Sequence, residues 1–428
     1  MRQIKRKSHR DKKIIEAVVR RFGPLSRVNI HEVTGLRRST ISSLVRGLLE
    51  DRKLLETGLS NNPMGRKQVL LSLNPDYGFV VALEFDDQAV VAAILDLSPR
   101  VRHLAQESVD LEHGVDGLVK QLQGCARRAI QEAGLAGRSP LGIGIADPGL
   151  VDSRQGTTLT CSTISFWKQV PLGRLFEQEF QVPVIVESKT RAKAIAERIL
   201  GAGGAANDMI YVDYGTGIGA GIIVDGKVLY GRDCGVGEFG HTHNTDGKSA
   251  CKCGSIGCLE ALAGCAAIES KIHVALAEGA ESEAADLART DGSTITAWHV
   301  LQAAHRGDKI SVNIVAEVSR YLGLGISNLV NLFNPSVVVL DHRLEVAGDG
   351  LLSQIWQIIR RQALRCSVDH LMFRYGTLGN EAGVLGTALV VLDKYFEIPT
   401  MTPARFKARP MPSAGSNPPQ VPALQGQG

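Results

Sequence analysis

The segment GEFGHTHNTDGKSACKCGSIGCLE, Gly237 to Glu260, brings three thiols and an imidazole close together in a chain whose other cysteines are scattered singly. In a reducing compartment, closely spaced cysteines bind metal or do chemistry more often than they form disulfides. Glycines at positions 254 and 257 let such a loop wrap an ion. The pattern predicts a closed, structural Zn²⁺ site, because four ligands leave no position for a catalytic water; the predicted ligands are His241, Cys251, Cys253 and Cys258. Two alternatives are His243 in place of His241, and cysteines that cluster without binding metal.

The composition around this segment is that of a globular protein, with 44% hydrophobic and 21% charged residues among 428. We find no apolar run at the N-terminus and no stretch approaching the roughly 20 apolar residues that span a bilayer. We therefore expect a cytoplasmic protein without a membrane partner.

The formal net charge of +4 hides a strong asymmetry along the chain. Residues 1–75 carry 17 Lys and Arg against 6 Asp and Glu, a charge of +11, which leaves −7 for the remainder. A basic head on an acidic body is typical of a DNA-binding module joined to a domain with another task. For residues 1–13 alone, a solvated basic tail is the alternative.

The basic head has the pattern of a winged helix-turn-helix. Apolar residues recur at helical spacing over 12–22, and Ser26 is a plausible N-cap for a short second helix that ends at the turn 34–36. A third helix buries Ile41, Leu44, Val45, Leu48 and Leu49. Its outward face carries short hydroxyls between arginines, which suits a helix in the major groove of double-stranded DNA. The predicted contacts are Arg37, Arg38, Ser39, Thr40, Ser42, Ser43 and Arg46.

A wing follows this third helix. Residues 54–57 and 68–73 read as two short strands joined by a Gly, Asn and Pro loop. At its tip, Arg66 and Lys67 would reach the minor groove and respond to its width and negative potential. The alternative for the whole head is a generic three-helix bundle.

From Tyr77 onward, strands and helices alternate in a manner that predicts a mixed α/β fold with antiparallel hairpins. The loop DYGTGIGAG, Asp213 to Gly221, lies between two strands. Its glycines would admit a phosphate, but tight chain reversal explains such a loop equally well. The tail 397–428 is rich in Pro, Gly, Ser and Gln, and we expect it to be disordered.

The sequence from Tyr77 to Phe396 resembles the ROK family of bacterial repressors and sugar kinases. The resemblance rests on ADPGLVD, DYGTGIGAGIIVDGKVLYG, GEFGH, CKCGSIGCLE and ISNLVNLFNPSVVVL. It implies an actin-like, ribonuclease H-like body of two lobes behind a winged head. The expected domains are a head of residues 1–75, a first lobe of 76–200 completed by the helix 382–396, a second lobe of 201–381, and the tail.

The resemblance also implies site residues. In that family the zinc is structural, and His241 would both bind zinc and meet a sugar hydroxyl, alongside Glu238 and Glu260. Ring hydroxyls can donate to carboxylates in fixed geometry, which makes this set chemically reasonable. Ser188 stands where the family has an asparagine that also contacts sugar.

Three departures from the kinase pattern predict that phosphoryl transfer is lost. Lys189 stands in place of the aspartate that takes the hydroxyl proton, and a cation cannot serve as that base. The first phosphate loop, which in the family resembles DIGGTK, is EFDDQA at 84–89. The adenosine-site GGG is DHR at 341–343.

We therefore expect a transcriptional regulator, most simply a repressor, that forms a homodimer or homotetramer and responds to a small carbohydrate or sugar phosphate. Lys189 would favour a phosphorylated or acidic sugar, or it drifted after catalysis ceased and turns to solvent. The alternatives are a sugar kinase with an added DNA-binding head, and a regulator that binds proteins without a sugar ligand.

Overall fold

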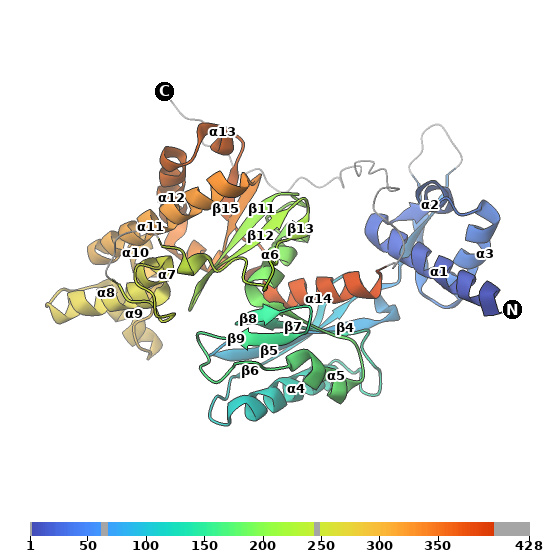
Figure 1. The fold of residues 1–428 in the computed structure, drawn as a ribbon, viewed down its shortest axis with the longest axis horizontal. Coiled ribbons are helices and arrows are strands. Elements are labelled where there is room, and N and C mark those ends of the chain that lie inside the picture. The colour runs from blue at the N-terminus through green and yellow to red at the C-terminus, as the bar shows by residue number, and fades with distance from the viewer. Residues whose placement is uncertain (1, 61–66, 244–248, 398–428) are drawn as a thin grey trace. The chain divides into compact units, whose positions relative to one another are not determined.

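The computed structural model describes residues 2–60, 67–243 and 249–397. These residues form two compact units, and the chain passes from the first unit to the second between Tyr77 and Gly78 (Figure 1). Within the described residues, none of the helices is long and apolar enough to cross a bilayer. The expected disordered tail lies outside the described residues, apart from Glu397.

The first unit is a winged helix-turn-helix with its own core. In chain order its elements are α1 (Arg2–Phe22), β1 (Leu25–Ser26), α2 (Arg27–Thr34), α3 (Arg38–Glu50), β2 (Leu54–Leu59) and β3 (Val69–Leu73). The strands form a sheet of order β1-β3-β2. The predicted stripe of α3 is buried at Ile41, Leu44, Val45 and Leu48, and Leu49 packs against it.

Local chemistry explains the boundaries of these helices. Ser26 caps α2 as predicted, because its hydroxyl accepts the N–H of Asn29 at 3.2 Å. Gly35 ends α2 in the left-handed conformation that glycine adopts without strain. Helix α1 begins ten residues before the predicted start at Lys12, since the preceding residues have good helix propensity but no apolar period to reveal them.

The second unit contains two five-stranded sheets with the same topology, one in each lobe. The first has the order β10-β7-β4-β5-β6 and the second β13-β12-β11-β14-β15. In both, the first three strands in sequence pair antiparallel and the last two add in parallel beside the first. The mixed α/β fold with antiparallel hairpins is therefore confirmed, as two lobes.

The first lobe contains β4 (Phe79–Phe85), β5 (Ala89–Asp96), β6 (Val101–Ser108), α4 (Gly114–Glu132), β7 (Ile143–Asp147), β8 (Leu150–Asp152), β9 (Thr157–Thr160), α5 (Leu172–Phe180) and β10 (Val184–Ser188). Helix α6 (Lys189–Ile199) leads to the second lobe. The last helix, α14 (Ala382–Tyr395), returns to lie along one face of the first sheet, while α4 and α5 cover the other (Figure 1).

The second lobe contains β11 (Met209–Tyr214), β12 (Ile218–Val224), β13 (Lys227–Val228), α7 (Leu259–Ala263), α8 (Cys265–Ala277), α9 (Glu283–Asp291), α10 (Ala297–His305), α11 (Lys309–Phe333), β14 (Val337–Leu340), α12 (Gly348–Gln362), α13 (Arg365–Val368) and β15 (Met372–Tyr375). Its large core joins one face of the sheet to α7–α12. Helix α6 packs on the opposite face. The position of α6 between the lobes places its first turn at the smaller of the two cavities described below.

Candidate functional site

The cysteine segment folds into a tight loop. The N–H of Cys251 donates to the carbonyl of Ser255 at 2.8 Å, and that of Gly254 donates to the carbonyl of Cys251 at 3.0 Å. Gly254 and Gly257 have φ of 91° and 78°, which strongly favour glycine. The two glycines therefore allow the chain to turn back and gather its thiols.

The four predicted metal ligands meet at one point. Their ligand atoms all lie within 4.8 Å of one another; the residues are His241, Cys251, Cys253 and Cys258. The Cys253 and Cys258 sulfurs are 3.7 Å apart, and the Cys251 sulfur is 3.6 Å from His241 Nδ1. Zn–S bonds of about 2.3 Å in a tetrahedron separate two sulfurs by about 3.8 Å, so the donor set fits Zn²⁺. The exposed His243 is outside this cluster, which disfavours it as the fourth ligand.

Along the chain, Glu238 precedes the four predicted metal ligands and Glu260 follows them. Glu238 immediately precedes the 3-10 turn Phe239–His241, and its Oε2 is 4.0 Å from His241 Nε2. Glu260 lies in the first turn of α7, and its Oε2 accepts the N–H of Ile218 at 3.1 Å. Burial raises the pKa of Glu238, and the negative charge of Glu260 adds to this shift. His241 thus has one ring nitrogen toward the thiols and the other toward a carboxylate.

The glycine loop between β11 and β12 is packed against side chains of this protein. A Cβ at Gly217 would lie 2.8 Å from Glu260 Oε2, and one at Gly219 would lie 2.8 Å from Thr190 Oγ1. A Cβ at Gly215 would lie 2.9 Å from Arg343 Nη1. These close approaches give the loop a packing role, which favours the structural interpretation over phosphate binding.

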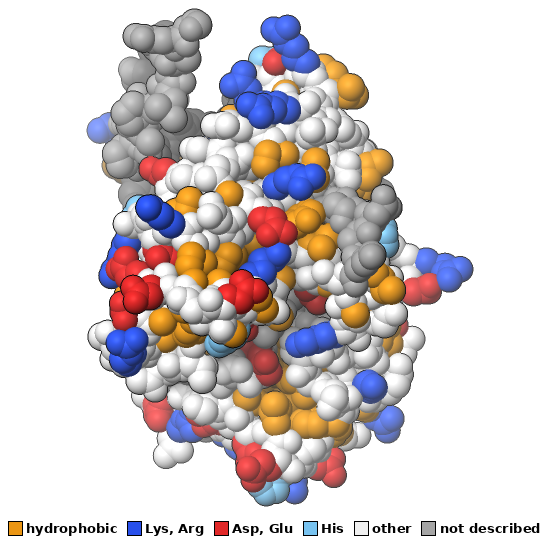
Figure 2. Space-filling view, turned by 90° about the vertical axis from the view of Figure 1, so that its left-hand side faces the viewer, with side chains coloured by type: hydrophobic (Ala, Val, Ile, Leu, Met, Phe, Trp, Pro, Cys, Tyr) orange, Lys and Arg blue, Asp and Glu red, His pale blue; other side chains and the backbone are white. Residues whose placement is uncertain are grey.

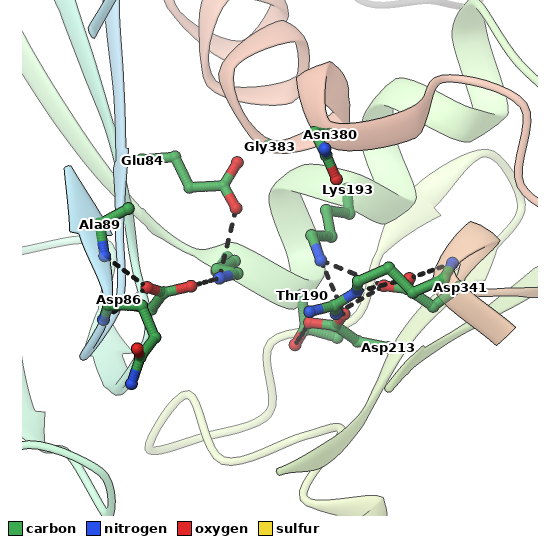
Figure 3. Close-up of polar contacts among 12 residues, drawn as sticks. Glu84, Asp86, Ala89, Thr190, Lys193, Asp213, Asp341, Asn380 and Gly383 are labelled. Carbon is green, nitrogen blue, oxygen red and sulfur yellow. Dashed lines mark hydrogen bonds and ion pairs between the residues drawn. The ribbon is translucent and has the colours of Figure 1, made fainter. Parts of the chain in front are cut away.

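Lys189, the first residue of α6, is buried rather than turned to solvent. Its Nζ lies 2.8 Å from Asp86 Oδ2 and 3.3 Å from Glu84 Oε1, and its side chain is 13% exposed (Figure 3). Burial lowers the pKa of Lys189, but the carboxylates of Glu84, Asp86 and Asp213 outweigh burial, so the net shift is upward. The ammonium group is therefore charged and already paired, a contact that argues against drift to solvent.

One turn further along α6, Lys193 enters a second cluster that sequence reasoning missed. Its Nζ is 2.8 Å from Asp213 Oδ1 and 3.1 Å from Asp341 Oδ2. Arg343 binds both oxygens of Asp341 at 2.9 Å and reaches Asp213 Oδ1 at 3.3 Å. Figure 3 shows Lys193 beside Asp213 and Asp341. The sequence signals were an aspartate inside the apolar run of β11 and the DHR segment at 341–343, and neither indicated that they meet at Lys193.

The predicted ligand residues line two different cavities. Glu260 and Cys251 line one of about 520 Å³, whereas Lys189 lines another of about 150 Å³ between the lobes. Ser188, Glu238 and His241 line neither. The glycine loop lies between the cavities, because its Thr216 lines the larger and its Gly215 abuts Arg343, which lines the smaller.

The predicted DNA contacts share one face of α3. Its N-cap residue and five helix positions are exposed, and Thr40 is half-buried; the exposed residues are Arg37, Arg38, Ser39, Ser42, Ser43 and Arg46. The guanidinium of Arg37 is a donor only, so it cannot accept the N–H groups at the start of α3, and the side chain is exposed. Lys67 is exposed beside the wing, and Arg66 lies outside the described residues.

The model of the ROK family matches residues 84–394, most of the chain. The chain belongs to the ROK family. The family carries the two-lobed actin-like body, so the fold expected from the sequence is confirmed.

Similar ROK proteins include both repressors and kinases. A xylose repressor from Caldicellulosiruptor bescii is 29% identical over 377 residues, which cover 88% of this chain and 93% of the repressor. A solved ROK transcriptional regulator, a homologue of the Escherichia coli Mlc protein, covers 91% of this chain at 26% identity with a TM-score of 0.78. A glucokinase from Halalkalibacterium halodurans is 36% identical over 252 residues, which cover 59% of this chain and 76% of the kinase.

Proposed function

We propose that this ROK protein is a DNA-binding transcriptional regulator, a repressor of carbohydrate genes, whose DNA affinity is set by a small carbohydrate bound by its body. The observation that carries the proposal is the exposed basic face of α3, on a folded head with a +11 charge. The repressor relatives support it, because they match the chain over nearly its whole length.

Contacts from α3 and the wing would divide into two kinds. Arg38 and Arg46 would neutralise phosphates or bind guanine edges, while the short hydroxyls of Ser39, Ser42 and Ser43 let the helix approach the bases. Lys67 and Arg66 would hold the wing at the adjacent groove. Two heads in a homodimer or homotetramer would read two half-sites.

We propose that the body no longer transfers phosphate. Lys189 occupies the position where the kinases of this family carry a carboxylate base, and an ammonium bound to Glu84 and Asp86 has no lone pair with which to take a proton. Arg343 lies against Gly215 of the glycine loop. That contact fills the space through which a nucleotide's phosphates would approach the loop.

The Cys and His cluster would hold Zn²⁺ as a structural ion. Four protein donors complete the tetrahedron, so the ion would brace the loop without activating water. By fixing His241, the metal would also fix the imidazole nitrogen that faces Glu238. The hydroxyls of a sugar would then meet preorganised acceptors at Glu238 and Glu260, with Ser188 at the end of β10 as a further partner.

Control of DNA binding requires that the carbohydrate bind one arrangement of the two lobes better than the other. Lobe closure around the ligand would change the spacing or freedom of the two heads in the oligomer. The ligand would then shift the population toward the arrangement with low operator affinity.

A gel shift on the DNA upstream of the protein's own gene, at stated salt, tests the proposal. We expect specific binding that one sugar releases. Failure of every sugar to alter the shift, combined with ADP release in a coupled assay, would instead establish a kinase with an added head, which the glucokinase relative makes the main competitor. Unaltered DNA binding with no ADP release and no thermal shift would favour a protein-binding regulator.

A further inference from the structure

The smaller cavity lies where the two lobes face each other, and charged side chains from both lobes line it. Its lining includes Glu84 and Asp86 from the first lobe, Lys189 and Lys193 from α6, and Arg343 from the second lobe. Its volume is about 150 Å³. What this cavity accepts depends on how many of those charges are free to meet a ligand.

The ammonium group of Lys189 is not free. Asp86 and Glu84 both bind it, at 2.8 Å and 3.3 Å. Asp86 is itself fixed, because its Oδ1 accepts the N–H groups of Gln88 and Ala89 at 2.9 and 3.0 Å. Reorienting Asp86 to release Lys189 would break three hydrogen bonds at once.

The other two cations are held as firmly. Lys193 lies between Asp213 and Asp341, and Arg343 makes a bidentate pair with Asp341. Asp341 also accepts the hydroxyl of Tyr211 at 3.0 Å and is fully buried. Because buried ion pairs are strongly destabilised when one partner is left alone, these cations do not exchange their carboxylates for a ligand.

The charged groups at and beside the smaller cavity carry a net negative charge. Among the described residues, three cations (Lys189, Lys193 and Arg343) face four carboxylates (Glu84, Asp86, Asp213 and Asp341). The surplus lies on the first-lobe side, where Glu84 Oε2 is buried against Gly383 of α14 and accepts no hydrogen bond from the described part of the chain. A further negative charge brought into the cavity would add to this surplus.

We infer that the cleft selects a carbohydrate without phosphate or carboxylate, and that Lys189 acts as an internal counter-ion rather than as a receptor for an anionic group. The inference rests on the proposed function, since Lys189 directly follows Ser188, one of the sugar partners proposed above. It assigns to Glu84 and Asp86 the role of specificity determinants.

Isothermal titration calorimetry tests this with a panel of neutral aldoses and N-acetylamino sugars, each beside its terminal monophosphate. For the full chain we expect one neutral sugar to bind about tenfold or more tightly than its monophosphate. The double variant Glu84→Gln/Asp86→Asn releases the Lys189 ammonium, and we expect it to lose this discrimination and bind the monophosphate at least as well. A matched control is Glu283→Gln, which removes the partner of Arg306 from an exposed pair of the second lobe and leaves selectivity unchanged.

Circular dichroism and a melting curve establish that the variants fold; if the double variant does not, Asp86→Asn alone serves, because Asp86 is 29% exposed. Wild-type protein that binds the monophosphate as tightly as the parent sugar overturns the inference. If that monophosphate also releases the operator in the gel shift, the proposed function stands while the inference fails. A panel that neither binds nor releases DNA overturns both.

Discussion

Asp341 is the residue on which the second-lobe charge cluster depends. Its carboxylate is fully buried and receives Lys193, Arg343 and Tyr211. Burial opposes its ionisation, but the two cations outweigh burial and hold the pKa of Asp341 well below the usual range. The folded state therefore requires the charged form of this side chain.

Asp341→Asn is expected to lower the free energy of unfolding of the body by roughly 3–5 kcal/mol at pH 7, because it leaves the buried Lys193 and the partly buried Arg343 with one carboxylate. Since the folded pKa is depressed, the stabilisation is present above the unfolded value near 4 and is lost as pH falls through the folded value. The gap between wild type and variant should thus shrink below about pH 4. Urea unfolding at pH 7 and pH 3.5 measures both effects. Asp286→Asn, which breaks an exposed pair with Arg289, is the control and should change stability by less than about 0.5 kcal/mol.

Contacts between residues that are close in the sequence could be predicted, whereas contacts between distant residues could not. The clustering of His241 with three cysteines and the Ser26 cap both depend on neighbours that are close in the sequence, and the structure shows both. Lys193 and Asp341 are 148 residues apart, so only the packed lobes bring them together. The same holds for Lys189, whose burial between carboxylates 103 and 105 residues earlier no local pattern could indicate.

Helices α6 and α14 pass so close that glycine is required at their contact. A Cβ on Gly386 would clash with the backbone carbonyl of Ala192, which cannot move without shifting α6. The contact matters because α6 carries both lysines of the cleft and α14 covers the first sheet. The spacing of these two helices therefore sets the position of Lys189 relative to Glu84.

Gly386→Ala should destabilise the body by about 1–3 kcal/mol through overpacking, and should also weaken sugar binding by displacing α6. Gly124→Ala on α4 is a matched control, since a Cβ there meets nothing within 4 Å, and it is expected to stabilise by about 0.5–1 kcal/mol. Thermal melting and calorimetry on the two variants check this. Equal stability of both would contradict the close contact.

A substitution on α3 should affect DNA affinity differently if the residue contacts a phosphate than if it contacts a base. If Arg38 neutralises a phosphate, Arg38→Ala lowers affinity for all DNA sequences and reduces the slope of log affinity against log salt by about 1. If it binds a guanine edge, the variant loses about 1–3 kcal/mol for the operator only. Fluorescence anisotropy at several salt concentrations separates the two. Arg289→Ala in the second lobe is the control, and a slope and affinity unchanged by Arg38→Ala would remove α3 from the interface.

Helices and strands with a regular hydrophobic pattern could be predicted from the sequence, whereas the shortest strands could not. The longer strands of the two sheets and the stripe of α3 follow from apolar runs or helical spacing. Strands β1, β8 and β9 have two to four residues, too few to display alternation, and the predictions missed them. Their pairing depends on backbone partners that the fold supplies.

At the scale of the molecule, the charge asymmetry of the sequence becomes a difference between units. The cationic excess is spread over the head, with Arg38 and Arg46 exposed on α3, whereas the body carries a net negative charge. On the face shown in Figure 2, acidic, basic and hydrophobic side chains are intermixed. Long-range attraction of DNA is therefore expected from the head, with little contribution from the lobes.

Removal of the metal is expected to destabilise the body as a whole. At free zinc about 1,000 times the dissociation constant, binding stabilises the folded state by about 4 kcal/mol, so exhaustive chelation should lower its melting temperature. Cys258→Ser should do the same without chelator, whereas Cys366→Ser, at an exposed thiol outside the cluster, should not. Elemental analysis of the purified protein should give about one zinc per chain. A melting temperature insensitive to chelation and to Cys258→Ser would contradict a structural ion.

The return of α14 to the first sheet also orders events during synthesis. The core of the head draws only on residues before Tyr77, so the head can fold as soon as it leaves the ribosome. The last strand of the first sheet, β10, ends at Ser188. The helix that covers one face of this sheet, α14, ends only at Tyr395. At 5–20 residues per second, roughly 10–40 s of translation separate the two. A nascent chain thus carries a folded winged helix-turn-helix on an incomplete body, and a chaperone has that interval in which to shield the uncovered strands.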